Sequence, residues 1–398
     1  MPLTGSSSPA RSILPGSTLG ILGGGQLGGM FAAAARRMGY RVEVISDVAD
    51  CPAARLCDRL HVGRYDDPDF LAAAARGLDV VTFEFENVPA TAAHALAAVV
   101  PVRPDPEVLF ITQDRAREKS FLEKYGFACV PHRVVRSSAE LTTACAQLGR
   151  PAVLKTAAFG YDGKGQRWLG EGDDPATAWH ELGGNAPAGP REFVVESWLD
   201  FDCEISVVAA RGLDGTTAAF APTRNIHSRH ILDVSSTPAT LSAAVQAEAV
   251  SLTQRILKTL GVVGVACVEF FVTRDGRILV NEIAPRTHNS GHLTIEACET
   301  SQFEQQVRAV CGLPLGSTLQ IAPAAMANLL GECWFDQTGG LQEPDWAAAL
   351  SLPGVCLHLY GKSEPRQGRK MGHLTALGPT VIEAVERVTQ ARRLACRH

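Results

Sequence analysis

The stretch VACVEFFVTRDGRILVNEIAPR, residues 265–286, predicts a β-hairpin. Its two apolar runs flank Asp-Gly at residues 275–276, and Asp-Gly is a favoured two-residue hairpin turn. With this turn Arg274 faces Arg277, and the register follows residue by residue along both strands. The turn therefore predicts which side chains of the two strands lie opposite each other.

The predicted register places two acidic side chains face to face, Glu269 on the first strand and Glu282 on the second. Like charges in this position destabilise a sheet, and the apolar neighbours Val268 and Ile283 indicate a half-buried site. A desolvated pair of anions needs a cation, and Mg²⁺ is commonly held by one or two carboxylates together with substrate phosphates. We expect Mg²⁺ here, with Asn281 adding an oxygen ligand or a hydrogen bond, whereas solvated surface glutamates are the alternative.

A second signal is the glycine-rich segment GYDGKGQ, residues 160–166, between two predicted strands. It lacks the G-x-x-x-x-G-K-[ST] pattern of a Walker loop, and its three glycines exceed what a plain hairpin turn needs. Such a flap can cover nucleotide phosphates, with backbone N–H groups and Lys164 as donors. Lys155 ends the preceding apolar strand, where it is either solvated or faces a phosphate. Flap and hairpin together indicate a Mg-nucleotide and phosphoryl chemistry.

A third signal, ILGGGQLGGM at residues 21–30, contains Gly-x-Gly-x-x-Gly between an apolar strand and an Ala-rich helix. Backbone N–H groups at such a helix N-terminus favour phosphate. Asp47 follows the second predicted strand, where the ribose-binding acid of a dinucleotide site would lie. A dinucleotide-binding oxidoreductase is therefore one interpretation. A hydride-transfer enzyme has no need of a magnesium hairpin, however, so we expect this loop to hold another phosphate.

Two groups of cationic and polar side chains follow the hairpin. The segment APRTHNSGH, residues 284–292, supplies Arg286, His288, Asn289 and His292, and residues 360–373 supply Lys362, Arg366, Arg369, Lys370 and His373. A solvated face is the alternative for either group. Since the chain has no overall basic excess, such clusters beside glycines suit a phosphorylated anionic substrate.

The composition narrows the class of protein. The 398 residues are 46% hydrophobic and carry a net charge of −5 with a pI of about 6.1, which gives no general attraction to nucleic acid or to an anionic membrane. No window approaches the roughly 20 apolar residues of a membrane span. The 11 cysteines include no C-x-x-C pair, which predicts reduced, mostly buried thiols in the cytoplasm and no structural zinc site.

The order of predicted elements indicates the fold. TLGIL, YRVEVIS and LDVVTFEFE predict strands that alternate with helices in QLGGMFAAAARRMG and DDPDFLAAAARG, a pattern typical of a doubly wound parallel sheet. Farther on, REFVVESWL and EISVVAAR predict strands, and LSAAVQAEAVSLTQRILKTLG predicts an amphipathic helix. After GLPLGS we expect short strands and turns to the end of the chain.

The motifs GGGQLG, FEFENVP, QDR, GYDGKGQ, VEFFV, NEIAPR-HNSGH, SQFEQ-RA--GLPLG and GRKMGH occur in one characteristic order. The sequence resembles the ATP-grasp superfamily and, within it, most closely the 5-(carboxyamino)imidazole ribonucleotide synthase family of purine biosynthesis. The resemblance runs from about residue 18 to about residue 375. It departs from the family's pattern at Gly29, Arg224, His230 and Thr287, where arginine, glutamate, glycine and proline are usual.

The resemblance implies a mixed α/β and α+β fold with three folded parts. We expect a disordered tail over residues 1–16, a Rossmann-like domain over 17–112, an ATP-grasp domain over 113–315 and a small β-rich C-terminal domain over 316–398. The flap belongs to a smaller subdomain at about residues 130–198. The family also implies a homodimer.

By similarity to the family, the nucleotide site comprises residues from the QDR, flap, ESWL and NE motifs and their neighbours. These are Arg115, Lys155, Gly160, Tyr161, Asp162, Gly163, Lys164, Gly165, Gln166, Glu196, Ser197, Trp198, Leu199, Glu204, His227, Asn281 and Glu282. Glu269 and Glu282 would hold Mg²⁺, as the hairpin predicts independently.

The resemblance also implies a substrate, aminoimidazole ribonucleotide, that bicarbonate carboxylates at the expense of ATP through carboxyphosphate. The implied substrate-binding residues are Gly25, Gln26, Leu27, Glu86, Lys362, Arg369 and Lys370, and the catalytic candidates are Asp162, Tyr161, Lys164, Arg286 and His288. Another ATP-grasp ligase, such as a formate-dependent ribonucleotide transformylase, is the nearest alternative, and the dinucleotide oxidoreductase is a distant one.

Overall fold

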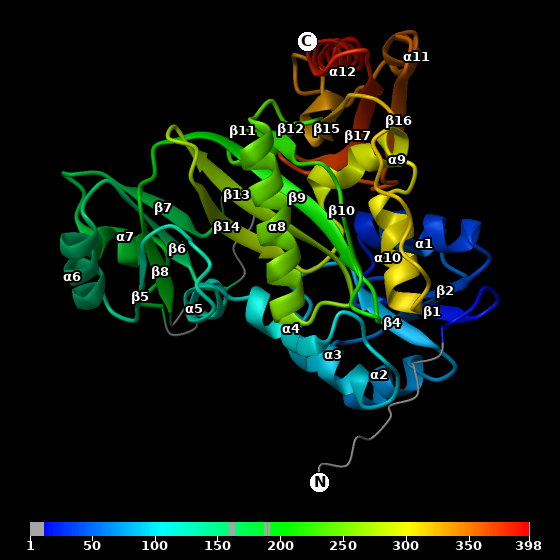
Figure 1. Ribbon diagram of the computed structural model, residues 1–398, viewed down its shortest axis with the longest axis horizontal. Coiled ribbons are helices and arrows are strands. Elements are labelled where there is room, and N and C mark those ends of the chain that lie inside the picture. Colours follow the sequence, from blue (N-terminus) through cyan, green and yellow to red (C-terminus); the bar gives the residue numbers. More distant parts are fainter. Residues whose placement is uncertain (1–11, 159–163, 187–188, 190–191, 398) are drawn as a thin grey trace.

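The computed structural model (Figure 1) describes residues 12–158, 164–186, 189 and 192–397. Its first part is a parallel sheet in the strand order β3-β2-β1-β4. The elements are β1 (Thr18–Leu22), α1 (Gln26–Arg37), β2 (Arg41–Ser46), the 3₁₀ turn η1 (Pro52–Arg55), β3 (Arg59–Val62), α2 (Pro68–Ala74), β4 (Val80–Phe83), α3 (Ala90–Ala97) and α4 (Pro106–Thr112). The chain order reverses between β1 and β4, and ligands bind beyond the strand ends at such a switch point.

The predicted disordered tail is too long at its C-terminal end. The N–H of Ile13 donates to the carbonyl of Cys311 at 2.8 Å, and the Ile13 carbonyl accepts from the hydroxyl of Tyr40 at 2.7 Å. Residues 12–16 are therefore tied to the folded protein. Residues 1–11 lie outside the described part of the chain.

The second part is a small antiparallel sheet in the order β5-β8-β6-β7, seen at the left of Figure 1. Its elements are α5 (Arg115–Lys124), β5 (His132–Val135), α6 (Ser138–Leu148), β6 (Ala152–Thr156), β7 (Gln166–Leu169), α7 (Pro175–Glu181) and β8 (Phe193–Ser197). Leu154 and Phe193 on the sheet pack with Leu141 and Trp179 on the helices. This core fixes β6 and β7, the two strands that flank the glycine-rich segment.

A long antiparallel sheet forms the centre, in the order β14-β13-β9-β11-β12-β15-β17-β16, with β10 also paired to β9. Its first elements are β9 (Phe201–Arg211), β10 (Thr217–Ala219), β11 (Thr223–Ser228), β12 (Ile231–Thr237), α8 (Ala243–Leu260), β13 (Gly264–Thr273) and β14 (Ile278–Ala284). The 3₁₀ turn η2 (Asn289–Leu293), α9 (Thr294–Ala297) and α10 (Gln302–Cys311) follow. Because β12 pairs with β15, the C-terminal strands extend the same sheet.

The predicted turn of the β13–β14 hairpin is wrong by one residue, yet the facing carboxylates are confirmed. Thr273 bonds the carbonyl of Arg277, and Gly276 has φ +83°, so three residues rather than two make the turn. A β-bulge at Asn281 then restores the register, and Glu269 pairs with Glu282. The inserted residue cancels the turn's shift, because a bulge sets two residues of one strand against one of the other.

The C-terminal part contains more helix than the sequence predicts. After β15 (Ala324–Leu330), the 3₁₀ turn η3 (Gly331–Trp334), α11 (Trp346–Leu350), β16 (Val355–Leu359) and β17 (Lys370–Leu377), the chain ends in α12 (Val381–Cys396). The buried face of α12 includes Ala384, Val388 and Ala391, which pack on β15 and β17. Small alanines make this apolar face inconspicuous in the sequence. None of the helices in the described residues has the length and apolar character to cross a bilayer.

The expectation that the cysteines are reduced is wrong for one pair. Cys333 on η3 and Cys396 at the end of α12 form a disulfide with their Cα atoms 4.6 Å apart. The other nine cysteines are free, and five of these are buried. A separation of 63 residues gave no local signal of this pairing.

Candidate functional site

The site centres on the carboxylates of Glu269 and Glu282. The carboxylate of Glu269 accepts a hydrogen bond from Nε2 of His288 at 2.9 Å. Although burial alone would raise it, the hydrogen bond and charge of His288 lower the pKa of Glu269 to about 2. Solvent still reaches Glu282, but the surrounding protein and the charge of Glu269 raise its pKa. Glu269 is thus an anion matched by a histidine, while Glu282 lacks a comparable partner among the described residues.

Several charges predicted for the site act on this carboxylate pair. Arg115 and His288 stabilise the anionic form of Glu282, and Glu86 opposes it. His227 and Lys370 stabilise the anionic form of Glu269. Residues from five separate stretches of sequence therefore converge on one hairpin.

A rigid hydrogen-bond network holds His288 in place. The Nδ1 of His288 contacts the hydroxyl of Ser290 at 2.8 Å, and Ser290 contacts Ser206 at 2.7 Å. The side chain of Gln302 accepts from the backbone N–H of His288 and donates to its carbonyl, at 2.9 and 2.7 Å. Burial by itself would lower the pKa of His288. Cys267 and Glu269 nevertheless raise this pKa to about 10, so the ring is cationic at neutral pH.

On the nucleotide side, two lysines share one buried carboxylate. Lys155 on β6 contacts one oxygen of Glu196 at 2.5 Å, and Lys119 on α5 contacts the other at 3.1 Å. Although burial alone would raise it, these two charges lower the pKa of Glu196. Lys119 also donates to the carbonyl of Asn281 at 3.1 Å, which ties this cluster to the carboxylate hairpin. Sequence reasoning missed Lys119, because an isolated lysine in a charged helix gives no signal of burial.

The remaining predicted nucleotide residues surround this cluster. Arg115 donates to the carbonyl of Thr156 at 3.0 Å, beside the strand that leads into the flap. His227 on β11 lies 2.9 Å from Glu204 on β9. Ser197 is the last residue of β8. Trp198, in the segment that links β8 to β9, is 52% exposed. Leu199 follows Trp198 directly in the chain.

The flap is described only at its C-terminal end. Gly165 has φ +71°, and a Cβ there would lie 2.5 Å from the hydroxyl of Thr156, so only glycine fits. Gln166 pairs with Lys155 as β7 begins, and Lys164 precedes it. The predictions for Gly160, Tyr161, Asp162 and Gly163 fall outside the described residues.

Behind the hairpin lies a carboxyl group that the sequence did not reveal. Glu118 on α5 is 2% exposed and accepts the backbone N–H of Ile283, next to Glu282, at 2.9 Å. Burial is the main cause that raises the pKa of Glu118 to about 8, and the neighbouring charge of Glu282 adds to it. Glu118 is thus a largely neutral group that fixes β14 beside Glu282.

At the N-terminal loop, a side chain occupies part of the predicted phosphate cradle. The carboxylate of Glu84, just after β4, accepts from the backbone N–H groups of Gly25 and Gly28 at 2.6 and 3.0 Å. A Cβ on Gly25 would lie 2.4 Å from this carboxylate, which explains the glycine. The backbone N–H groups of Gln26 and Leu27 lie at the start of α1, in the same loop-to-helix junction. The charges of Arg286 and Lys362 act on Glu84, so the two cationic segments meet at this loop.

Arg286 and Glu86 form a second ion pair across the same region. Both nitrogens of the Arg286 fork bond the carboxylate of Glu86, with Nη2 to Oε1 at 2.7 Å. Burial alone would raise it, but Arg286 lowers the pKa of Glu86. The pair joins the Rossmann-like part to the segment after the hairpin. Both residues were predicted for the substrate side, and they lie together.

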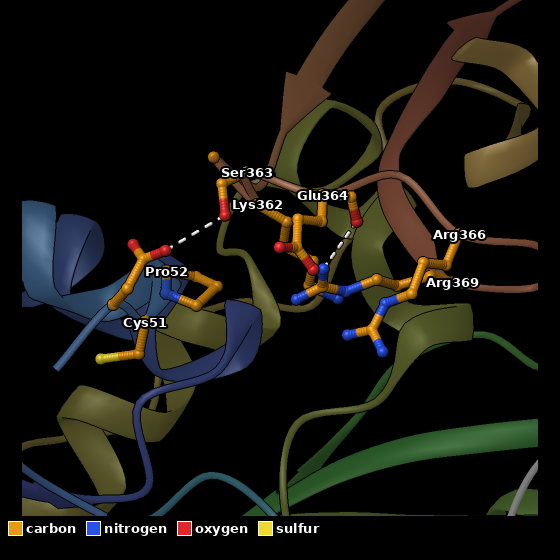
Figure 2. A pocket seen from close by; sticks show the side chains of 9 residues that line it. Cys51, Pro52, Lys362, Ser363, Glu364, Arg366 and Arg369 are labelled. Carbon is orange, nitrogen blue, oxygen red and sulfur yellow. Dashed lines mark hydrogen bonds between the residues drawn. The ribbon is translucent and has the colours of Figure 1, made fainter. Parts of the chain in front are cut away.

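The C-terminal cations line a polar cavity of about 210 Å³ between η1 and the loop before β17 (Figure 2). Its walls are Asp50, Cys51, Pro52, Gly361, Lys362, Ser363, Glu364, Arg366 and Arg369. Ser363 donates to Asp50 at 3.1 Å and Arg369 donates to the Glu364 carbonyl at 2.6 Å, which close the cavity on two sides. Lys362 donates to the carbonyl of Lys370 at 2.6 Å. The cavity thus gathers the cations expected for a phosphorylated ligand.

Two histidines of the predicted cationic groups do not belong to the site. His292 is 1% exposed and His373 is fully buried, and their rings stack with centroids 4.7 Å apart. Burial lowers the pKa of both well below the usual value, so neither carries charge. Nδ1 of His373 forms a hydrogen bond with the hydroxyl of Tyr360 at 2.9 Å. The expectation that they face an anion is wrong, because they join the C-terminal strands to η2.

Comparison with known proteins agrees with this geometry. The chain matches the family models of the ribonucleotide synthetase preATP-grasp domain at residues 17–113, the ATP-grasp domain at 120–303 and the phosphoribosylaminoimidazole carboxylase C-terminal domain at 324–387. It is 44% identical over 373 residues to N5-carboxyaminoimidazole ribonucleotide synthase of Brucella melitensis, covering 93% of this chain and 99% of the relative.

Solved structures are similar over nearly the whole chain. An ADP complex of an N5-carboxyaminoimidazole ribonucleotide synthetase aligns with a TM-score of 0.87 and 39% identity, covering 96% of this chain and 98% of the other. The Aspergillus clavatus synthase in complex with ADP and 5-aminoimidazole ribonucleotide aligns with a TM-score of 0.85 and 30% identity, covering 96% and 99%. The fold, the site and these relatives lead to one conclusion: the chain belongs to the N5-carboxyaminoimidazole ribonucleotide synthase family of ATP-grasp ligases.

Proposed function

We propose that this chain carboxylates the exocyclic amine of aminoimidazole ribonucleotide with bicarbonate, and converts ATP to ADP and phosphate, in purine biosynthesis. The observation that carries the proposal is the convergence on Glu269 and Glu282 of nucleotide-side charges, Arg115 and His227, and substrate-side charges, Glu86 and Lys370. A single centre for two substrates suits an enzyme that transfers a reactive intermediate between them.

The reaction needs two steps, because bicarbonate is a poor electrophile. A bicarbonate oxygen attacks the γ-phosphorus of ATP, the bond to ADP breaks, and carboxyphosphate forms. The bond between the carboxyl carbon and the phosphate oxygen of carboxyphosphate then breaks, which yields CO₂ and phosphate beside the amine. The amine nitrogen bonds the carbon of CO₂ and loses a proton. Enclosure protects carboxyphosphate from water. We assign the cationic His288 and Arg286 to the stabilisation of its negative charge.

The donor set of the hairpin fits Mg²⁺. Glu269 and Glu282 present hard carboxylate oxygens from facing positions, and the raised pKa of Glu282 reflects a site where a cation would relieve repulsion. Bound there, Mg²⁺ would neutralise charge on the transferring phosphoryl group. Asn281 contributes its carbonyl to Lys119 and forms the bulge that aligns the two glutamates.

We assign the other residues by their place around the pair. The nucleotide is oriented by Lys155, Lys119 and Glu196. Its phosphates are contacted by Lys164 and the flap. The substrate side is served by Tyr161 and Asp162. Asp162 is the candidate group for the amine proton. Gln26, Leu27, Lys362, Arg369 and Lys370 hold the ribonucleotide phosphate, beside the Gly25 N–H that Glu84 occupies. These residue roles, a homodimeric assembly and a cytoplasmic location are proposals that rest on membership of the family.

The direct test is ADP release from the purified protein with Mg-ATP and bicarbonate, with and without aminoimidazole ribonucleotide. We expect ADP formation to depend on the ribonucleotide and on bicarbonate, with no stimulation when formate replaces bicarbonate. Glu282→Ala should abolish it. ATP binding without stimulation by the ribonucleotide would overturn the proposed substrate, and sedimentation of the same preparation would test the dimer.

A further inference from the structure

The turn between β11 and β12 has a backbone that its residues disfavour. Ser228 pairs with Ile231, which leaves Arg229 and His230 as a two-residue turn with φ +50° and +65°. Turns of this kind favour Asn and Gly, because side chains crowd the backbone at positive φ. Among the described non-glycine residues only Arg397 shares such a value. A turn with two large cationic or aromatic side chains at these positions calls for an explanation.

Arg229 reaches the loop that lines the polar cavity. Its Nη2 lies 3.1 Å from Oε1 of Glu332, and Oε2 of Glu332 accepts the backbone N–H of Gly368 at 3.0 Å. Ile231 packs at the same place, since a Cβ on Gly368 would lie 3.1 Å from its side chain. Arg366 and Arg369, on either side of Gly368, line the cavity. One carboxylate thus connects Arg229 to the loop expected to bind the ribonucleotide phosphate.

His230 reaches in the other direction, to the nucleotide side. Nδ1 of His230 accepts from Nε2 of Gln166 at 3.3 Å. Gln166 pairs with Lys155 across β7 and β6, and Lys155 contacts Glu196 in the buried cluster. The contact joins the small sheet to the long one at the residue where the flap returns to its strand. Neighbouring residues of one turn therefore contact Glu332, which binds the cavity loop, and Gln166, where the flap ends.

The hairpin that carries the turn is anchored in the sheet at its base. β11 pairs with β9 at Thr223–Asn225 and β12 pairs with β15 at Val234–Thr237, whereas nearer the turn the two strands pair with each other. His227, three residues from His230, lies against Glu204 in the predicted nucleotide site. A continuous chain of contacts therefore runs from Gly368 through Glu332 and Arg229 to the turn, and from the adjacent His230 to Gln166.

We propose that the Arg229-His230 turn couples the two substrate sites, so that binding of the ribonucleotide raises affinity for the nucleotide and the reverse. The proposal rests on the proposed function. Arg229 and His230 are positioning residues, since neither is argued to touch a reacting atom. A turn that only reversed the chain would have no need of side chains at positive φ, and an exposed ion pair adds little stability by itself.

The test is titration with ADP, a nucleotide that does not react, in the absence and presence of aminoimidazole ribonucleotide. Coupling free energies between sites are reciprocal and commonly correspond to about fivefold or more in affinity. We expect wild-type protein to bind ADP at least about fivefold more tightly with the ribonucleotide, and Arg229→Gly and His230→Gly each to bring that factor to about one. Arg229→Lys, which keeps the charge, should restore most of the coupling.

Arg397→Gly is the matched control. Arg397 also has positive φ, +54°, and an exposed ion pair, with Asp345 at 3.3 Å, but it lies at the end of α12. Its substitution should leave the coupling unchanged. Equal coupling in wild type and both turn variants, or no coupling in wild type, would overturn the inference. If wild-type protein forms no ADP in response to the ribonucleotide, the proposed function is overturned instead.

Discussion

Two hairpins of the same sheet meet the demands of a turn in opposite ways. In the β13–β14 hairpin, Gly276 takes the positive φ and Asp275 bonds Thr273 and Arg277. The residues match the backbone, and the predicted chemistry lies farther along the strands at Glu269 and Glu282.

In the β11–β12 hairpin the turn itself makes the contacts. Arg229 and His230 occupy positions that favour glycine or asparagine, and each reaches a different part of the protein. The comparison indicates that local preference decides a turn that only reverses the chain, and that contacts beyond the hairpin can override it.

The largest effect should come from the carboxylate end of the β13–β14 hairpin. Glu282→Gln keeps the shape but removes the charge that faces Glu269, and we expect ADP formation to fall at least about 1,000-fold. Arg274→Ala, at the turn of the same hairpin, removes only an exposed ion pair with Asp200 and should leave the rate within about twofold. Steady-state rates of both variants check this, and a Glu282→Gln enzyme with normal turnover would contradict the assignment.

The next effect concerns Glu118, which anchors β14 next to Glu282. Its pKa rises on folding from 4.5 to about 8, mainly through burial. The stabilising contribution of the neutral carboxyl is therefore complete below about pH 4.5 and is lost as the pH rises through about 8. Glu118→Gln stays neutral and keeps an acceptor, so its stability relative to wild type should increase by a few kcal/mol between pH 5 and pH 9, on the order set by linkage.

Urea unfolding midpoints at several pH values, in the presence of a metal chelator, measure this difference. The chelator is needed because a cation near Glu282 would change the neighbouring charge. A constant difference between wild type and Glu118→Gln across the range would show that Glu118 is ionised in the folded protein.

A smaller loss should follow substitution at the plain turn. Gly276 has φ +83°, and a Cβ there would meet only the side chain of Val245 at 3.9 Å, so space is available but the backbone is not favourable. Gly276→Ala should lower the free energy of unfolding by about 1 kcal/mol without changing kcat or either KM. A change in KM would mean that this turn, too, takes part in the site.

The smallest effect, of opposite sign, should come from the contacting turn. Arg229→Gly relieves the positive φ but loses an exposed ion pair and makes the unfolded chain more flexible. We expect a gain in the free energy of unfolding of about 0.5 kcal/mol, measured by urea denaturation beside the control Arg397→Gly. A loss of several kcal/mol would show that Arg229 has a structural role rather than a coupling one.

Local patterns predicted much of the fold and the centre of the site. Alternating apolar segments gave the parallel sheet, and the two strands around residues 275–276 gave the facing Glu269 and Glu282. The turn was wrong by one residue because Asp-Gly also fits a three-residue turn that ends in a glycine of positive φ. The bulge at Asn281, which restores the register, leaves no clear mark in the sequence. The helix α12 was missed because three of its four buried residues are alanines, and such small side chains weaken the apolar period that predicts a helix.

What the sequence determined by itself was local: which segments form strands, where the chain turns, and which residues of one hairpin face each other. Only the tertiary structure decided that Glu84 occupies amides of the N-terminal loop, that His292 and His373 are buried, that Cys333 meets Cys396, and that the β11–β12 turn contacts Glu332 and Gln166. The physical reason is distance along the chain. A hairpin sets its own register through neighbouring residues, whereas burial, charge pairing and contact between separate elements depend on packing that no short segment specifies.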